Sequence, residues 1–253
     1  MKMNEEKIVD VPMEDEKIVE EVPEQTEIVE EVVWEPKTEL GKKVKNGEIT
    51  SLRSLLESGV RILEPEIVDF LEPNLQIDFI KAGQAKGKFG GGKRIIFKKV
   101  QHKSGEGNKQ EFVALAVVGN GKGIVGMGLA KASDNKPARE KAIRQAKLNL
   151  IALPFGCGSW ECNCGGTHSI PFAVYGRCGS ARVYLYPAPK GTGFVVDNEV
   201  AKILKLAGYT DVRGKVYGSS RHKINVIKAT FNALKKLSQV KMHQSYVSKI
   251  KVN

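Results

Sequence analysis

Short apolar runs alternate with polar turns over the middle of the chain, and they predict an antiparallel sheet. Branched apolar residues gather at residues 95–97, 112–118 and 124–125, and runs of this length and composition are typical of strands. A polar loop at residues 103–108 separates the first two runs, and a tight-turn sequence, Gly119-Asn120-Gly121, separates the last two. Connections this short join antiparallel neighbours, so the three runs predict a meander.

A helix is expected directly after the meander. Pro137 suits a first helical turn and the residues that follow are good helix formers, so the helix is predicted to run from Asn135 to about Leu153. Its cations fall mostly on one side at the helical period. Three strands followed by a basic helix are also how a double-stranded-RNA-binding domain ends.

The chain after Pro154 predicts a second unit with its own core, and the domain boundary is placed near that residue. Its elements, in order, are strands at 169–175 and 181–186, a helix at 198–207 closed by Gly208, a strand at 212–217 and a helix at 224–237. This order is β-β-α-β-α, and with the meander it predicts an α+β fold. Ahead of the meander, short helices are expected at residues 51–56 and at 65–71, the second opened by Pro65.

Charge divides the chain into an acidic tail and a basic body. The 253 residues carry 40 Lys and Arg against 29 Asp and Glu, a net of +11. Residues 1–39 hold 14 acids and 4 bases, a net of −10, so the remainder carries +21. The tail repeats Glu-Lys-Ile-Val at residues 6–9 and 16–19 with Pro12 between them, a composition that predicts disorder. It either screens the basic body before a polyanion is met or recruits a partner.

The densest cationic run favours nucleic acid as the partner. Residues 79–105 hold eight Lys and Arg and no acid, whereas a solvated surface normally mixes both signs. Within this run the glycines of Phe89-Gly90-Gly91-Gly92-Lys93-Arg94 would let the backbone lie against phosphates while the two cations pair with them, which suits irregular RNA. The alternatives are a basic surface that serves solubility alone and a loop that is merely mobile.

A glycine pattern at residues 121–126, Gly-Lys-Gly-Ile-Val-Gly, matches a dinucleotide-binding motif only in its letters. It follows a hairpin turn and enters a strand, whereas pyrophosphate binding needs the glycines at a strand-to-helix turn. These glycines are expected to allow the tight hairpin and the close approach of another backbone.

Four soft metal ligands lie within twelve residues: Cys157, Cys162, Cys164 and His168. Such a cluster among glycines is compatible with a tetrahedral structural zinc site. The spacing is not a C-x2-C pair and free Cys is also an ordinary buried residue, so buried thiols remain the alternative. Four Cys are too few for a disulfide scaffold and agree with a reducing compartment.

No catalytic set or membrane segment is evident in the sequence. The phosphate-binding loop with its GK[ST] ending and the nucleophile elbow are both absent, and no stretch approaches the roughly 18 apolar residues of a membrane span. An acidic run stands where a signal peptide would begin, so the protein is expected to be soluble and intracellular. The turn at residues 187–193 could cradle a phosphate in a small kinase-like enzyme, but no acidic group is evident beside it.

Four blocks along the chain resemble a known family. They are FVALAVVGNGKGIVGMGLAK at 112–131, GGGKR at 90–94, PAPKGTGF at 187–194 and VYGSSRHKINVIKA at 216–229. Over about residues 75–238 the chain resembles universal family five of the small ribosomal subunit proteins, in its archaeal form. The acidic repeat of the tail has no support from the family.

The resemblance implies a fold and a role. Residues 76–154 would form a domain similar to the double-stranded-RNA-binding fold, and residues 155–238 a ribosomal α+β domain with a left-handed βαβ crossover. Flanking them would be the disordered tail of residues 1–39, a helical extension at 40–75 and a basic tail at 239–253. The protein would be a structural, non-enzymatic component of the small subunit in the cytoplasm, and a free RNA chaperone is the alternative.

The resemblance also implies partners and contact residues. Family members bind 16S ribosomal RNA, contact the neighbouring proteins of families four and eight, and help to set decoding accuracy. Contacts with RNA are then expected at the glycine run, the meander and the start of the last helix: Lys86, Lys88, Gly91, Gly92, Lys93, Arg94, Lys98, Lys99, Lys122, Lys131, Arg221 and Lys223.

Overall fold

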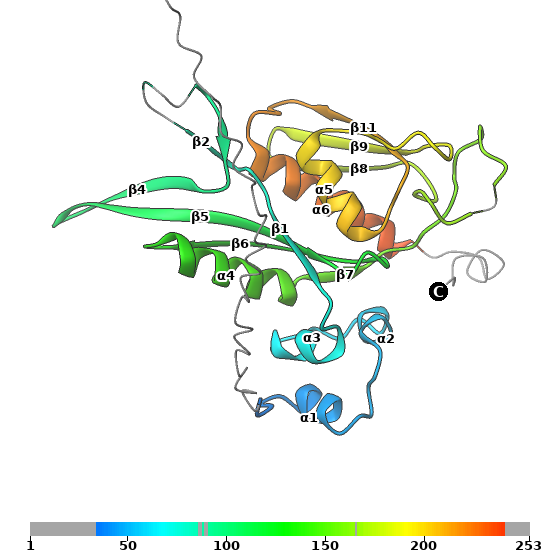
Figure 1. Ribbon diagram of the computed structural model, residues 1–253, viewed down its shortest axis with the longest axis horizontal. Coiled ribbons are helices and arrows are strands. Elements are labelled where there is room, and N and C mark those ends of the chain that lie inside the picture. Colours follow the sequence, from blue (N-terminus) through cyan, green and yellow to red (C-terminus); the bar gives the residue numbers. More distant parts are fainter. Residues whose placement is uncertain (1–33, 86–87, 89–90, 165, 241–253) are drawn as a thin grey trace, which may run out of the picture. The chain divides into compact units, whose positions relative to one another are not determined.

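The computed structural model describes residues 34–85, 88, 91–164 and 166–240 (Figure 1). The chain divides into a unit that ends at Trp34 and a second unit that begins at Glu35 and carries all the elements described below. The predicted acidic tail and basic tail lie almost entirely outside the described residues, as does Lys86.

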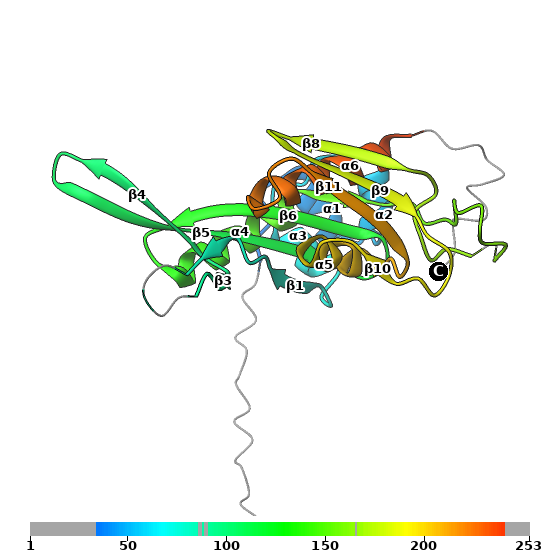
Figure 2. The same ribbon diagram turned by 90° about the horizontal axis from the view of Figure 1, so that it is seen from above.

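The second and third runs of the predicted meander form the centre of an antiparallel sheet. The strand predicted at residues 95–97 is wrong, because Ile95 pairs with Gly83 in a separate ribbon and the strand beside the second run begins at Lys98. In this sheet β5 (Gly107–Gly119) pairs with β4 (Lys98–Ser104) along its first half and with β6 (Ile124–Ala132) on its other edge. The strand β1 (Gln76–Phe79) pairs with the second half of β5. The loop predicted at residues 103–108 is shorter, because Ser104 pairs with Gly107 and only two residues form the tip. Figure 2 shows this β4–β5 hairpin reaching beyond the helices.

One face of this sheet is covered by α4 (Asn135–Leu148), which is shorter than predicted. The expected continuation to Leu153 is wrong, since residues Leu150–Ala152 form β7, which pairs with β6. Helix propensity distinguishes ordinary residues by less than about 1 kcal/mol. Here the backbone N–H and C=O groups along the edge of β6 form hydrogen bonds with β7. The free energy of satisfying these groups outweighs the helix propensity of residues 150–152.

The second half builds a mixed sheet in the order β10-β11-β9-β8. Its strands and helices are, in chain order, β8 (Val174–Cys178), β9 (Ala181–Pro187), β10 (Phe194–Val195), α5 (Asn198–Ala207), β11 (Val212–Tyr217) and α6 (Lys223–Gln239). The predicted ends of α5 and β11 are confirmed, and Gly208 closes α5 in the left-handed region with φ of 94°. The two-residue strand β10, which runs parallel to β11, was not predicted.

The first strand of this half begins at Val174 and not at the predicted Ser169. Ser169 instead forms an isolated bridge with Gly156, and its hydroxyl donates to the carbonyl of Asp211 and accepts from the amide of Ala188. Its backbone and side chain are therefore used to anchor the preceding loop, which removes this segment from the sheet.

The layers pack in the order α4, first sheet, α5 with α6, second sheet (Figure 1). Because α5 and α6 lie between two sheets, one hydrophobic core joins Leu115 and Val117 of β5 with Ile203 of α5 and with Val183 and Leu185 of β9. The prediction that the second half has its own core is therefore wrong, since its helices are covered by the first sheet. The outer face of the second sheet carries no helix among the described residues. That open face is free to present its side chains outward.

Three short helices precede the sheets: α1 (Glu39–Lys45), α2 (Leu52–Glu57) and α3 (Glu66–Leu71). The helices predicted at residues 51–56 and 65–71 are confirmed as α2 and α3. Lys147 of α4 lies 2.5 Å from Asp69 of α3, which ties this extension to the first sheet's helix. Within the described residues no helix combines the length and apolar character that a membrane crossing requires.

Candidate RNA interface and metal centre

Gly91 and Gly92 lie in the turn of a small ribbon that presents cations. In this ribbon β2 (Gly83–Gln84) pairs with β3 (Arg94–Ile95), and the Ala85 amide donates to the Lys93 carbonyl over 2.8 Å. Gly91 and Gly92 adopt φ of 51° and 71°, the left-handed region that glycine occupies without strain. Lys88 and Lys93 are exposed at this turn.

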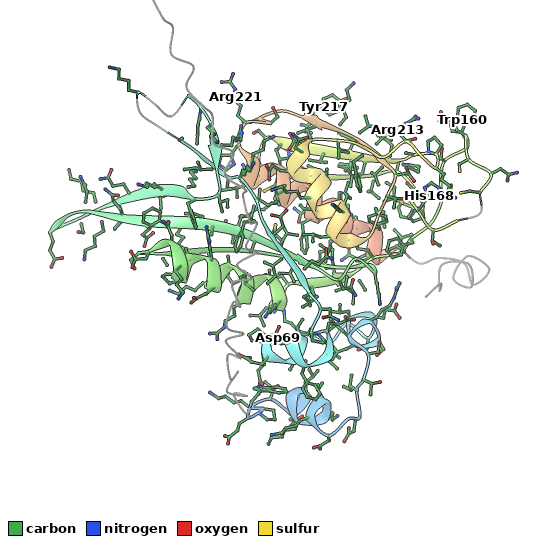
Figure 3. The ribbon with its side chains drawn as sticks, in the orientation of Figure 1. Asp69, Trp160, His168, Arg213, Tyr217 and Arg221 are labelled. Carbon is green, nitrogen blue, oxygen red and sulfur yellow. The ribbon has the colours of Figure 1, made fainter. Side chains whose placement is uncertain are left out.

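A second predicted block meets this ribbon in space. The guanidinium of Arg94 donates to the backbone carbonyl of Arg221 over 3.1 Å, although 127 positions separate the two residues. Arg221 lies exposed in the turn that joins β11 to α6, near Tyr217 in Figure 3. The structure therefore joins Arg94 of the ribbon to the turn at Arg221, in the block at residues 216–229. We refer to Lys88, Lys93 and Arg94 of the ribbon, together with Arg221, as the cationic group.

The remaining predicted cations are spread over the first sheet. Lys98 of β4 and Lys131 of β6 both lie opposite Val113, and Lys99 stands 5.4 Å from the ring centre of Phe112. Lys122 lies in the turn between β5 and β6, at the far end of β5 from the hairpin tip. It is thus separated from Lys98 by much of the length of β5.

Lys223 is held in an ion pair. Its ammonium lies 2.5 Å from the carboxylate of Asp197, and only 11% of its side chain is exposed. Asp197 precedes α5 and Lys223 begins α6, so this pair links the two helices that lie between the sheets.

Both predictions for the glycine pattern at residues 121–126, a tight hairpin and the close approach of another backbone, are confirmed. The pattern spans the turn between antiparallel β5 and β6 and enters a strand. The amides of Gly121 and Gly123 donate to the carbonyls of Leu206 and Ala207 over 2.9 Å each. These glycines therefore bind the end of α5 to the hairpin, and their amides are not aimed at a pyrophosphate.

The open face of the second sheet is a surface that the sequence interpretation did not identify. Its outward positions alternate with buried ones and hold four tyrosines, four cations and no acid: Tyr175, Arg177, Arg182, Tyr184, Tyr186, Arg213, Lys215 and Tyr217. The period-two alternation of residues 181–186 was the signal that could have found it.

Three of the four tyrosines on this face form a continuous aromatic row. The rings of Tyr175 and Tyr184 stack with centres 5.6 Å apart, and Tyr217 meets Tyr184 edge to face at 5.4 Å. The Lys236 ammonium stands 3.9 Å from the ring centre of Tyr175, at a hollow between β8 and α6. Of the four cations on the sheet face, Arg213 reaches Glu161 at 3.2 Å.

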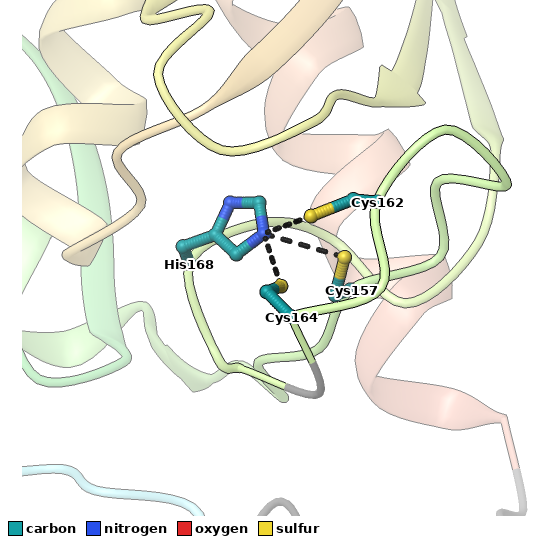
Figure 4. Close-up of side chains that lie close together, drawn as sticks. All are labelled: Cys157, Cys162, Cys164 and His168. Atoms are coloured by element: carbon teal, nitrogen blue, oxygen red, sulfur yellow. Dashed lines mark hydrogen bonds between the residues drawn. The ribbon is translucent and has the colours of Figure 1, made fainter.

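The four predicted metal ligands come together in the loop that precedes β8 (Figure 4). The Nε2 atom of His168 lies 3.3 Å from the Sγ atom of Cys157, 3.8 Å from that of Cys162 and 3.2 Å from that of Cys164. All four ligand atoms lie within 4.8 Å of one another. Cys178 is outside this group and packs against the hydrophobic core.

The pKa values of two of these thiols are shifted in opposite directions. Burial raises the pKa of Cys157 to about 11, and the hydrogen bond with Cys164 adds to the shift. The backbone of Lys190 and the side chain of Cys164 lower the pKa of Cys162 to about 6. Cys162 is thus the thiol of this pair that carries negative charge at neutral pH.

Asp211 stands behind the histidine, and the sequence did not suggest this. Its Oδ2 atom lies 2.9 Å from Nδ1 of His168, while its Oδ1 atom accepts from the amides of Gly191 and Gly193 over 3.0 and 2.8 Å. Burial alone would raise the pKa of this carboxyl group, but the hydrogen bonds from Gly193, Thr210 and His168 bring it below its usual value.

The sequence suggested that no acidic group lies beside the turn at residues 187–193, and the position of Asp211 shows that this expectation is wrong. Asp211 occupies the amides of Gly191 and Gly193 that a phosphate would need, and its charge would repel that phosphate. The turn is therefore closed by the protein itself, which argues against the kinase-like alternative.

Comparison with known proteins shows the family to which this chain belongs. Residues 92–154 match the family model described as "Ribosomal protein S5, N-terminal domain", and residues 176–246 match "Ribosomal protein S5, C-terminal domain". A small ribosomal subunit protein uS5 from Nanoarchaeum equitans is 49% identical over 214 residues, which are 85% of this chain and 92% of that protein. The chain belongs to the uS5 family.

Further uS5 relatives come from other archaea. The protein of Methanocaldococcus jannaschii is 43% identical over 86% of this chain and 93% of its own length, and that of Staphylothermus marinus is 42% identical over 80% and 87%. The family predicted from the sequence blocks is thereby confirmed together with its archaeal type. A ribosomal protein, and not an enzyme, is what uS5 membership supports.

Proposed function

We propose that this chain is a structural component of the small ribosomal subunit and that it binds 16S ribosomal RNA through the cationic group at Lys88, Lys93, Arg94 and Arg221. The observation that carries the proposal is the hydrogen bond from Arg94 to the Arg221 carbonyl, because it joins the ribbon to a second cationic turn that is distant in sequence. Among the described residues, neither Lys88 nor Lys93 has an ion-pair partner. Their charges are therefore available to phosphates.

The first sheet supports a second part of the proposal. A three-stranded meander with α4 on one face is similar to the end of a double-stranded-RNA-binding domain. Lys98 and Lys131 add cations to one face of this sheet, and Lys99 adds one to the face that α4 covers. In the second half, the parallel pair β10 and β11 joined by α5 is the unit to which we assign the left-handed crossover.

The open face of the second sheet is proposed as a further RNA contact. Four cations and no acid stand at its outward strand positions, and only Arg213 among them is paired with an acid, Glu161. This excess of positive charge favours a polyanion, and exposed tyrosines can stack on unpaired bases. Contacts with the proteins of families four and eight, and a contribution to decoding accuracy, are part of the proposal on the family resemblance alone.

The cationic group is tested by replacing Lys88 and Lys93 together with Gln. Each lost phosphate contact lowers the salt slope of binding by about 0.7 to 0.9, so the pair should lower it by about 1.6. Each unit of slope corresponds to about tenfold in affinity between roughly 1 M and 0.1 M salt, so the affinity near 0.1 M should fall about 40-fold. Filter binding of the full chain to 16S ribosomal RNA over a salt series measures both quantities.

The matched control replaces Lys42 and Lys43 with Gln. These residues are exposed on α1 and their replacement changes the net charge by the same amount. If both double variants bind alike, the loss reflects overall charge and the assignment to the ribbon is wrong. Gradient fractions of a cell extract test the ribosomal role itself, since a free chaperone would not accumulate at one copy per small subunit.

A further inference from the structure

We propose that Cys157, Cys162, Cys164 and His168 bind one structural zinc ion through three sulfur atoms and Nε2. A tetrahedral site with Zn–S of about 2.3 Å and Zn–N of about 2.0 Å places N and S about 3.5 Å apart and two S atoms about 3.8 Å apart. The three N–S separations of 3.2, 3.3 and 3.8 Å surround the first value. The limit of 4.8 Å on every pair is compatible with the second.

Ordinary buried thiols would not produce this arrangement. Free Cys used as an apolar residue packs against hydrophobic side chains, as Cys178 does against the core. Cys164 is exposed, and Cys157 and Cys162 are only partly buried. All three sulfur atoms instead converge on one nitrogen of one imidazole, which is the geometry of a shared ion.

A thiol and imidazole with a carboxylate behind them also describe a nucleophile with its base. That arrangement needs one sulfur at the imidazole nitrogen, because Nε2 exchanges a single proton. Here three sulfur atoms lie within 3.8 Å of the same Nε2. Two further thiols at the same nitrogen have no role in such chemistry, whereas a tetrahedral metal uses all three.

Asp211 completes the site as a positioning residue. Metal-binding histidines usually present their second ring nitrogen to a carboxylate or carbonyl, which fixes the tautomer and the ring. Nδ1 of His168 lies 2.9 Å from Oδ2 of Asp211, and the amides of Thr210 and Asp211 donate to the His168 carbonyl over 3.0 and 3.2 Å. The ring is therefore held with Nε2 toward the three cysteines.

The ion would stabilise the middle of a loop that is held at its ends by the Gly156–Ser169 bridge and at Glu161 by the ion pair with Arg213. Between Phe155 and Ser169 the described residues form no helix or ladder strand, and Trp160 is 93% exposed. Because Asp211 also binds the amides of Gly191 and Gly193, the same site joins the loop to the turn at residues 187–193. Binding would thus order two segments at the start of β11.

The test is the metal content of the full chain, purified without chelator and measured by elemental analysis. We expect about one zinc per chain for the wild type and for Cys178→Ala, the matched control at the cysteine outside the cluster. The Cys162→Ser variant should lose most of the metal. Replacement by Co²⁺ should produce the visible absorption of a tetrahedral cobalt site with thiolate ligands, and Cys178→Ala should retain that spectrum.

A stably folded wild-type chain that holds no zinc and yields no such cobalt spectrum would overturn the proposal. Equal loss of metal from Cys178→Ala and Cys162→Ser would overturn the ligand assignment. If Cys162→Ser does not fold, a chelator titration of the wild type carries the test, because the Tm should fall as zinc is removed and return when zinc is added. The proposal rests on the geometry of the loop, so it does not depend on the RNA contacts.

Discussion

Replacement of Gly128 by Ala should destabilise the protein, because α4 packs directly on the backbone of β6. A Cβ atom at this position would lie 2.1 Å from the carbonyl oxygen of Ala142 and 2.3 Å from the amide nitrogen of Ala146. Both obstructing atoms belong to the helix backbone and cannot rotate away. The helix would have to withdraw by about 1 Å to reach the shortest contacts that real Cβ atoms make, near 3.0 Å.

The magnitude follows from what that withdrawal loses. Ala138, Ala142 and Ala146 are the fully buried residues of α4. A gap of up to 1 Å between the helix and the sheet would remove a quarter to a half of the energy of each of their dispersion contacts. Overpacking of this kind costs about 1–3 kcal/mol, and we expect about 3 because the obstruction is backbone. At about 2–4 °C per kcal/mol for a chain of this size, the Tm should fall by about 6–12 °C.

The matched control is Gly105→Ala at the tip of the β4–β5 hairpin. A Cβ atom there meets nothing within 4 Å, and the backbone is outside the left-handed region. Both variants gain the same restriction of the unfolded chain, about 0.4–1 kcal/mol, so their difference isolates the packing. Urea unfolding followed by circular dichroism measures it. If Gly128→Ala unfolds at the same urea concentration as Gly105→Ala, α4 does not pack as closely as described.

Two further predictions concern tyrosines with opposite roles. Tyr209 is buried and its hydroxyl donates to the Pro154 carbonyl over 2.8 Å, so Tyr209→Phe should cost about 1–3 kcal/mol in urea unfolding; an unchanged midpoint would show that the carbonyl finds another donor. Tyr175 is 53% exposed on the open sheet face, so Tyr175→Ala should weaken RNA binding by about 1–3 kcal/mol while Tyr175→Phe retains the ring and the affinity. Equal affinity of both variants would point to a protein partner on this face.

Much of the fold follows from local sequence signals. The hairpin at residues 119–121 and the helix closed by Gly208 are determined within a few positions, since turn geometry and helix termination depend on neighbouring residues. Strands β7 and β10 could not be predicted in this way. Each has only two or three residues, and each exists because a distant strand edge offers hydrogen bonds.

The candidate sites likewise combine residues that local sequence could mark and residues that only the tertiary structure brings in. The four metal ligands lie within twelve residues, so their spacing alone marked them, whereas Asp211 enters from 43 positions beyond His168 and was not predicted. The sequence also marked Arg94 and Arg221 separately. It could not show that one donates a hydrogen bond to the other.

The sequence by itself determined the family, the concentration of positive charge in the body and the elements with strong local signals. The tertiary structure alone decided which of the predicted cations share a surface, which of them is held by Asp197, and which tyrosines align on one open sheet face. The physical reason is that spacing along the chain records neighbours only within a helix turn or a strand. Charge, hydrogen bonds and ring contacts act through space between segments that meet only after the sheets have packed.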